Sequence, residues 1–448
     1  MTQVLLALVG LLLLVAGAEG LVRGASRLAG MMRIPPVVIG LTIVAFGTSA
    51  PELAVNIKAG IAGQADIAVG NVVGSNIFNI LFILGLSAVV TPLAVTQRLV
   101  RFDVPVMIAV SGLAWLFARN CAVSRVESLI MLLLLALYVF ALGAFSREKH
   151  ERVTDNNEPK VKERFSPRMT AFSVFGILLG LLLLLIGARW FVDGAVSIAR
   201  FWGVSELSIG LTLVAAGTSL PEAATSVVAS MRGERDIAVG NVVGSNIFNI
   251  LGVLAVAGLV SPGGLSLSEN AVFFDMPIML AVSVVCLPVF LTHAAISRNE
   301  GVFFLFYYLA YSVLIVLRAT DSPMLPMANT VLAYLVLPAT GAFLLASVGR
   351  AYMEVKSYAN AMAGDLSYAA LYATKNARKI FVLVAGVTLL IIGVAMMVLP
   401  GPATIVIPLA LALLGTEFVW ARRILKYLLD ETKSAVNRLT GNVGADNE

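Results

Sequence analysis

The sequence predicts an all-α polytopic membrane protein: a ten-helix core of two oppositely oriented five-helix repeats, followed by about three more hydrophobic segments. Of its 448 residues, 59% are hydrophobic and only 13% are charged, whereas soluble proteins average roughly 25% charged residues. Apolar runs of about 20 residues, the length of a membrane-spanning helix, recur along the chain. The stretch DIAVGNVVGSNIFNI also occurs twice without change, at 66–80 and 236–250.

Two groups of five apolar spans flank a charged linker. The first repeat covers residues 1–146, the linker 147–168 and the second repeat 169–320. The spans are predicted at about 3–22, 35–60, 67–90, 101–118 and 126–146, and again at about 169–192, 205–230, 237–260, 272–292 and 301–318. Because five is odd, the copies enter the membrane from opposite sides, an arrangement common in secondary transporters.

Basic residues predict the orientation, since Lys and Arg concentrate in cytoplasmic loops. With the N-terminus outside, the linker and most basic residues beside the spans lie inside: Arg23, Arg27, Arg33, Arg98, Arg101, Arg232, Arg235 and Arg298. The outside loops then hold Lys58, Arg119, Arg125, Arg200 and Arg318. We expect a bacterial inner-membrane protein with a cytoplasmic linker and C-terminal tail. The net charge of +5 reflects this topology and does not indicate a nucleic-acid partner.

Residues 321–448 follow the repeats and form a separate C-terminal membrane segment. It contains a predicted span at about 328–348, then a segment with tyrosines and basic residues that suits the headgroup zone as an interfacial helix. Apolar stretches follow at about 380–398 and 402–420, before a basic tail. The last stretch either spans the membrane or re-enters it, and the segment is interpreted as an interaction or anchoring module.

The motif Gly-Thr-Ser-x-Pro-Glu interrupts the second span of each repeat, ending at Glu52 and at Glu222. An acidic residue near the middle of a span costs about 2.5–3.5 kcal/mol on the insertion scale, so a functional role is favoured. Ser49-x-x-Glu52 and Ser219-x-x-Glu222 also match a capping box, with Pro51 and Pro221 near the first helical turns. We expect both interpretations to hold: the helix breaks, Ser49 caps its second half, and the Ala45 carbonyl becomes free in a cavity.

A polar stripe follows in the third span of each repeat. Its residues recur at i, i+4 and i+8, so they share one helix face: Asn71, Ser75 and Asn79, and then Asn241, Ser245 and Asn249. Hydrogen bonding between helices, helped by the nearby Gly-x-x-x-Gly pairs, is one explanation. Opposite the two glutamates, the stripes would instead form the second wall of an oxygen-lined site.

These candidate ligands are all hard oxygens from carboxylates, hydroxyls, amides and backbone carbonyls. Such ligands favour Ca²⁺, Na⁺ or Mg²⁺ over soft metals. Ca²⁺ takes about 6–8 oxygen ligands, and two carboxylates balance its charge, whereas Mg²⁺ resists full dehydration. The predicted chemistry is therefore the coordination of a cation, with Ca²⁺ favoured over Mg²⁺.

With these motifs, GTSAPE…GNVVGSNIFN and GTSLPE…GNVVGSNIFN, the chain resembles the sodium/calcium exchanger membrane family of the calcium/cation antiporter superfamily. The resemblance covers about residues 1–320 and implies exchange of Ca²⁺ for Na⁺ at a midplane site, with no cofactor. It implies Glu52 and Glu222 as principal ligands. Further oxygens would come from Thr48, Ser49, Ser75, Asn79, Thr218, Ser219, Ser245 and Asn249, and from the carbonyls of Ala45 and Ala215. Residues 376–430 resemble a small transmembrane family named for a Pro-Gly-Pro-Gly-Trp motif, although this chain has Ala403 and Thr404 after Pro402.

One departure concerns Asn79 and Asn249, where some family members carry an acid. Two central carboxylates instead of three argue against a K⁺-dependent exchanger and leave the Na⁺ stoichiometry open.

We expect alternating access, in which spans 1 and 6 slide against the other spans, and no obligatory protein partner. The alternative is Ca²⁺/H⁺ exchange, because protons also neutralise buried carboxylates. An intramembrane hydrolase using the two acids is disfavoured, because no nucleophile motif accompanies them.

Overall fold

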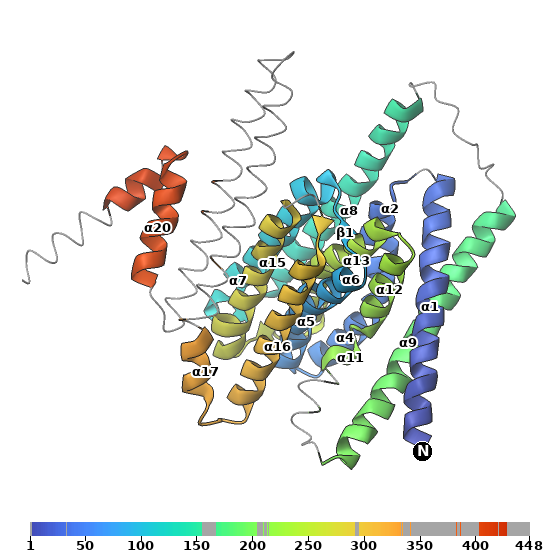
Figure 1. The fold of residues 1–448 in the computed structure, drawn as a ribbon, viewed down its shortest axis with the longest axis horizontal. Coiled ribbons are helices and arrows are strands. Elements are labelled where there is room, and N and C mark those ends of the chain that lie inside the picture. The colour runs from blue at the N-terminus through green and yellow to red at the C-terminus, as the bar shows by residue number, and fades with distance from the viewer. Residues whose placement is uncertain are drawn as a thin grey trace, which may run out of the picture. The chain divides into compact units, whose positions relative to one another are not determined.

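The computed structural model describes residues 2–32, 34–154, 167–203, 209, 213, 215–291, 295–332, 334, 341, 382, 386, 403–419 and 421–427 (Figure 1). Eight of the described helices are long and apolar enough to cross a membrane, and a bent pair from Pro36 to Ile61 would make a ninth. The predicted helical membrane fold is confirmed. The chain divides into two compact units, residues 1–286 with 294–322, and residues 287–293 with 323–448.

The first repeat contains long helices interrupted by short π-helical segments. Its elements are α1 (Thr2–Met32), α2 (Pro36–Ile39), η1 (Gly40–Val44), α3 (Ala45–Thr48), α4 (Ala50–Ile61), α5 (Ala65–Phe78), η2 (Asn79–Leu84), α6 (Gly85–Val90), β1 (Leu93–Ala94), η3 (Leu99–Asp103), α7 (Val104–Phe117), η4 (Ala118–Asn120), β2 (Ala122–Val123) and α8 (Arg125–Thr154). The segments η1, η2 and η3 are π-helical, a geometry that often occurs at functional sites. α8 continues into the predicted linker.

The second repeat has the same order of elements in its described part. They are α9 (Pro167–Phe201), α11 (Ala215–Gly217), α12 (Leu220–Met231), α13 (Arg235–Phe248), η6 (Asn249–Leu254), α14 (Ala255–Val260), β3 (Leu265–Ser266), η7 (Ala271–Asp275), α15 (Met276–Leu291), β4 (Ala295–Ile296) and α16 (Arg298–Ala319). The π-helical segments η6 and η7 recur at the places of η2 and η3. The first half of the predicted span 205–230 lies largely outside the described residues.

Contacts between the repeats follow a pseudo-two-fold axis. β1 pairs antiparallel with β4, and β2 pairs antiparallel with β3, so each two-stranded sheet takes one strand from each repeat. Ser111 and Ser283 face each other near this axis, with their hydroxyl oxygens 3.4 Å apart. Most residues of the repeated 15-mer are buried. Its two copies lie in α5 with η2 and in α13 with η6, which form the centre of the bundle.

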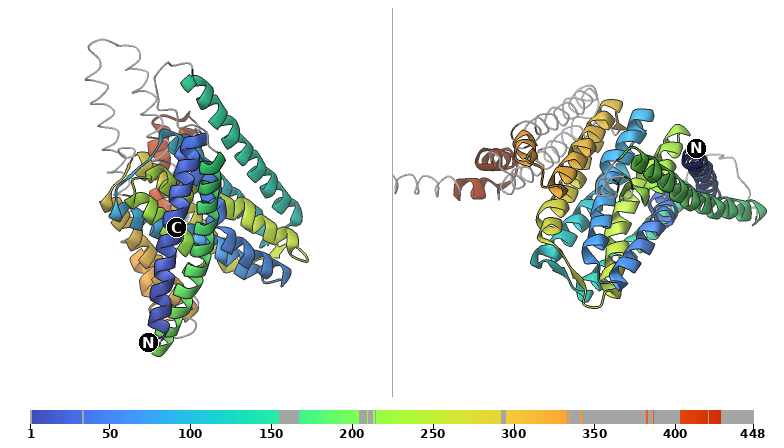
Figure 2. Two further views of the ribbon diagram at one scale, coloured as in Figure 1. Left: turned by 90° about the vertical axis from the view of Figure 1, so that its right-hand side faces the viewer. Right: turned by 90° about the horizontal axis from the view of Figure 1, so that it is seen from below.

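α1 and α9 lie side by side at one edge of the bundle (Figures 1 and 2). Their backbones touch along a row of glycines, where an added Cβ would lie closer than 3.0 Å to backbone of the other helix. This glycine seam consists of Gly10, Gly17 and Gly24 on α1 and Gly180, Gly187 and Gly194 on α9. Small residues permit such close contact between helices in a membrane. α1 also packs along α12.

The second unit contains α17 (Leu325–Val331) and α20 (Ala403–Gly415). α20 has 13 residues, whereas a helix needs about 20 to cross a bilayer. It ends at Gly415, whose carbonyl accepts bonds from the Arg422 guanidinium, and a cluster of Leu411, Leu414 and Ala421 packs across the turn. The predicted interfacial helix and the stretch 380–398 lie almost wholly outside the described residues.

Candidate ion-binding site

Two short helices carry the two glutamates. In the first repeat, α3 ends at Thr48 and α4 begins at Ala50, and the two parts of the span meet at 47°. The predicted break at this motif is therefore confirmed. In the second repeat, α12 begins at Leu220, after Thr218 and Ser219. Glu52 and Glu222 lie in the first turns of α4 and α12 and are 0% exposed, where the positive end of a helix dipole favours a carboxylate.

The predicted capping box at these breaks is wrong. Ser49 and Ser219 occupy the N-cap positions of α4 and α12, but neither side chain bonds to the backbone of its own helix. Ser49 Oγ donates instead to Glu222 Oε1 at 3.1 Å, and Ser219 Oγ donates to Glu52 Oε1 at 3.0 Å. A hydrogen bond to a carboxylate is stronger than one between neutral groups, so each hydroxyl is turned towards the acid of the other repeat. These reciprocal bonds bring the two glutamates to one place, where they interact electrostatically.

The predicted release of the Ala45 carbonyl is also wrong. This carbonyl oxygen accepts the Ser49 N–H at 3.0 Å, because the helical bonding continues through the bend. In the second repeat the turn is tighter: the Ser219 N–H donates to Ala216 at 3.2 Å, so this bond bypasses Ala215.

The second wall of the cluster comes from α5 with η2 and from α13 with η6. Ser75 Oγ lies 2.8 Å from Ser219 Oγ, and Asn249 Nδ2 donates to Ser75 Oγ at 3.1 Å. Asn79 and Asn249 stand at the first positions of η2 and η6. Ser75, Asn79, Ser245 and Asn249 are all buried. The predicted polar stripes therefore face the broken helices of both repeats.

Thr48 and Thr218 connect the broken helices to the other end of each stripe. Thr48 Oγ1 donates to Asn241 Oδ1 at 3.2 Å, and Thr218 Oγ1 donates to Asn71 Oδ1 at 3.3 Å. Asn71 in turn donates to Asn56 at 3.1 Å. Both threonine hydroxyls thus serve to brace the two walls, each across the repeat boundary.

Five buried oxygen atoms of this cluster have no hydrogen-bond partner among the described residues. They are Glu52 Oε2, Glu222 Oε2, Asn79 Oδ1, Asn249 Oδ1 and Ser245 Oγ. Buried polar atoms are nearly always paired, so such a group requires an explanation. All five can coordinate a hard cation, and they come from both repeats.

The charge of the site also indicates that it binds a cation. Within the described part of the chain, no basic side chain forms an ion pair with Glu52 or Glu222. A third buried acid, Asp103, differs: it pairs with Arg98 at 3.4 Å and accepts the Tyr138 hydroxyl at 3.1 Å. Isolated buried charges are expensive unless they are paired or coordinate a metal. The two glutamates are therefore suited to bind cations.

The sequence analysis missed Asn76 and Asn246, which lie within the repeated 15-mer next to Ser75 and Ser245. Both are buried, and each side chain bonds to residues of the other repeat. Their signal was a polar residue repeated at the same place in two largely apolar spans. It was overlooked because Asn76 lies one position off the stripe of Ser75 and Asn79.

The family model described as "Sodium/calcium exchanger protein" matches residues 2–143 and 172–317. The chain belongs to the sodium/calcium exchanger protein family. Membership in this family of membrane antiporters agrees with the two repeats and with the site between them. Residues 379–431 match a second family model, "Putative transmembrane protein (PGPGW)".

Relatives cover the sodium/calcium exchanger part of the chain. "Putative antiporter CaxA" of Alkalimonas amylolytica is 38% identical, over 69% of this chain and 97% of that protein. "Inner membrane protein YrbG" of Escherichia coli K12 is 40% identical, over 62% of this chain and 86% of that protein. The solved structure of the sodium-calcium exchanger NCX_Mj soaked with Na⁺ and Ca²⁺ is 32% identical, with a TM-score of 0.59, over 69% of this chain and 97% of that one.

Proposed function

We propose that this protein exchanges Ca²⁺ for Na⁺ across the membrane, with both ions using the site between Glu52 and Glu222. The observation that carries this proposal is the group of five unpartnered buried oxygens around two acids with no basic partner. Two carboxylates neutralise one Ca²⁺, and the neutral oxygens raise the ligand number towards the 6–8 that Ca²⁺ takes. Na⁺ is also a hard cation that needs these carboxylates, so the two ions compete.

The residues that hold the ions would be Glu52 and Glu222, with neutral oxygens from Ser75, Ser245, Asn79 and Asn249. Ser49 and Ser219 bond to the glutamates and fix one oxygen of each, which leaves the second oxygen for the ion. The carbonyls of Ala45 and Ala215 are secondary candidates. The Ala45 carbonyl already accepts the Ser49 N–H, so a contribution from it would use its second lone pair.

Alternating access would arise from movement of α1 and α9 as one body. The glycine seam places their backbones in direct contact, so the two helices are suited to shift together against the rest of the bundle. α1 packs along α12 and contacts η1, while α9 contacts α3, α11 and α12. A shift of the pair would therefore change what covers both broken helices.

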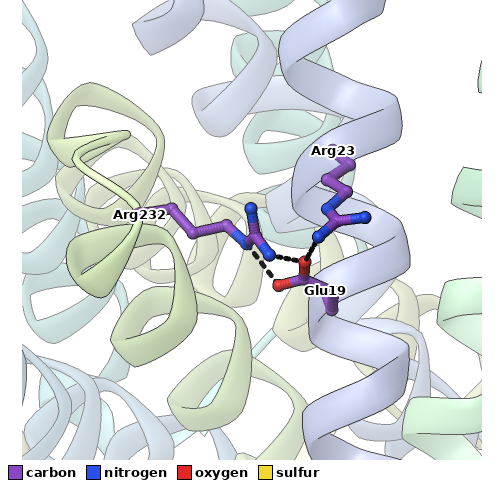
Figure 3. Close-up of polar contacts among 3 residues, drawn as sticks. All are labelled: Glu19, Arg23 and Arg232. Atoms are coloured by element: carbon purple, nitrogen blue, oxygen red, sulfur yellow. Dashed lines mark hydrogen bonds and ion pairs between the residues drawn. The ribbon is translucent and has the colours of Figure 1, made fainter.

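A charged contact in the second half of α1 connects this helix to the second repeat (Figure 3). Glu19 forms ion pairs with Arg23 on the same helix and with Arg232 at the end of α12. Ser26 donates to Glu234 at 2.5 Å. The corresponding turn of the first repeat reads Ala62-Gly63-Gln64-Ala65 and has no charge. This turn of the first repeat therefore cannot form the same ion pair, and the contact at Arg232 would stabilise the conformation seen here.

Arg232→Ala is expected to increase the population of conformations in which α1 has moved away from α12. Partly exposed ion pairs contribute about 0.2–1 kcal/mol, so the expected change is about 1.4- to fivefold. Spin labels at Met32→Cys and Met231→Cys, both exposed positions at helix ends, report the distance by pulsed electron resonance. Arg235→Ala is the matched control and should leave the distribution unchanged. An unchanged distribution in Arg232→Ala would contradict the role of the contact.

Ion coupling is tested with purified protein in proteoliposomes. Liposomes loaded with Na⁺ and diluted into Na⁺-free medium should accumulate ⁴⁵Ca²⁺, whereas liposomes loaded with K⁺ should not. Absence of flux driven by the Na⁺ gradient would refute Ca²⁺/Na⁺ exchange. Uptake driven only by a pH gradient in Na⁺-free medium would select the Ca²⁺/H⁺ alternative, in which the same glutamates exchange Ca²⁺ for protons.

The proposed location is the bacterial inner membrane, with the N-terminus outside and the linker inside. The distribution of basic residues beside the spans supports this orientation. The Escherichia coli relative is named as an inner membrane protein, which agrees with the location.

A further inference from the structure

The two amide ligands proposed above, Asn79 and Asn249, work only in one orientation. A side-chain amide offers a carbonyl oxygen on one side and an NH₂ group on the other. The oxygen attracts a cation, and the NH₂ group repels it. Something must therefore decide which end of each amide faces the ion. In this structure the nitrogen of each is engaged in hydrogen bonds, and the oxygen has no partner among the described residues.

The orientation of Asn249 can be traced to Asn76 in the other repeat. Asn249 Nδ2 donates to Asn76 Oδ1 at 3.1 Å. Asn76 Nδ2 in turn donates to the backbone carbonyl of Asn246 at 3.3 Å, and to Met279 Sδ at 3.6 Å. The chain of bonds runs from a backbone carbonyl through one amide to the next, and ends at the free oxygen of Asn249.

The orientation of Asn79 is traced in the same way to Asn246. Asn79 Nδ2 donates to Asn246 Oδ1 at 3.0 Å. Asn246 Nδ2 donates to the backbone carbonyl of Asn76 at 3.3 Å and to Met107 Sδ at 3.7 Å. The pseudo-two-fold axis relates the two chains of bonds, so each repeat orients the ligand of the other.

The anchor of each chain cannot be reversed. A backbone carbonyl only accepts hydrogen bonds, and a thioether sulfur has no proton to donate. Asn76 and Asn246 must therefore direct their nitrogens towards these groups and their oxygens towards Asn249 and Asn79. A reversed ligand amide would set its oxygen against another oxygen, and would leave buried donors unpaired at about 1–3 kcal/mol each.

We propose that Asn76 and Asn246 are positioning residues that turn the amide oxygens of Asn249 and Asn79 towards the transported cation. This inference rests on the proposed ion site. Neither residue touches the ion in this scheme; each acts through the ligand of the opposite repeat. Hydrogen bonds that merely join two helices would not require this alternation of donors and acceptors.

The test is a double-mutant cycle between Asn76 and Asn249, with Ca²⁺ dissociation constants measured by ⁴⁵Ca²⁺ binding to the full-length protein in detergent. Asn76→Leu should weaken Ca²⁺ binding by about 10–100-fold, the usual effect of losing an outer-shell partner of a metal ligand. Asn249→Asp removes the need for orientation, because both oxygens of a carboxylate are equivalent ligands. In that background Asn76→Leu should change the dissociation constant by less than about threefold, which the cycle reports as strong coupling.

Equal losses in the two backgrounds would overturn the proposal and would leave Asn76 a purely structural residue. A wild-type protein without saturable, Glu52-dependent Ca²⁺ binding would overturn the ion site itself, and the positioning role with it. Asn56→Leu removes another buried asparagine, which bonds to Asn71, and should show no dependence on the background. The mirrored cycle of Asn246→Leu with Asn79→Asp decides the question if Asn76→Leu does not fold.

Discussion

Glu52→Gln and Glu222→Gln should each lower Na⁺-driven ⁴⁵Ca²⁺ uptake by about 100-fold or more. Removing one partner of a buried charge pair typically costs about 3–5 kcal/mol, and each 1.4 kcal/mol is a factor of ten in binding. The substitution keeps the shape of the side chain and its bond from the opposite serine, so the loss isolates the charge. Initial uptake rates in proteoliposomes provide the measurement.

Equality of the two losses is the sharper part of this prediction. The reciprocal serine bonds place both acids in one cluster, so half of the site should not bind Ca²⁺ alone. Glu127→Gln is the matched control, because Glu127 is a partly exposed acid at the start of α8, and should retain wild-type uptake. Substantial uptake in either Glu52→Gln or Glu222→Gln would mean that the acids do not share an ion.

The sequence predicted the fold and the two walls of the site because both depend on exact repetition. Two identical 15-mers and two interrupted spans leave few arrangements other than two inverted halves that meet at their polar segments. What it misjudged was the direction of individual bonds. The pattern Ser-x-x-Glu does form a capping box at Ser297 and Glu300, where α16 begins. In the same pattern at Ser49, the serine hydroxyl donates to Glu222 instead.

The difference between these places is the surroundings of the motif, which local spacing does not contain. α16 begins beside a loop, where its own first turn supplies the nearest donors. Ser49 lies at the centre of the bundle, where a charged acceptor from the other repeat is within reach. Asn76 was missed for a related reason. Its partners, Asn246 and Asn249, are near only because the two repeats meet at the pseudo-two-fold axis.

The second large effect is expected from Gly17→Leu in the glycine seam. A Cβ at position 17 would lie 2.7 Å from the Gly180 carbonyl oxygen and from the Leu184 nitrogen. Backbone atoms cannot yield as a flexible side chain does, so α1 and α9 must separate. Overpacking of this kind typically costs about 1–3 kcal/mol. We expect Na⁺-driven Ca²⁺ uptake to fall by about 5- to 150-fold, as that free energy implies.

Comparing Ca²⁺ uptake with Ca²⁺ binding shows whether Gly17→Leu impairs the movement of α1 and α9. Gly17 is not among the described residues that hydrogen-bond to Glu52 or Glu222. Ca²⁺ binding in detergent should therefore fall much less than uptake. Gly187→Leu, at the equivalent place on α9, should behave in the same way. Gly143→Leu on α8, where no atom lies within 4 Å of an added Cβ, should leave both properties unchanged. If Gly17→Leu transports at the wild-type rate, α1 and α9 do not need to move as one body. If it loses binding and uptake equally, the seam supports the site and not the motion.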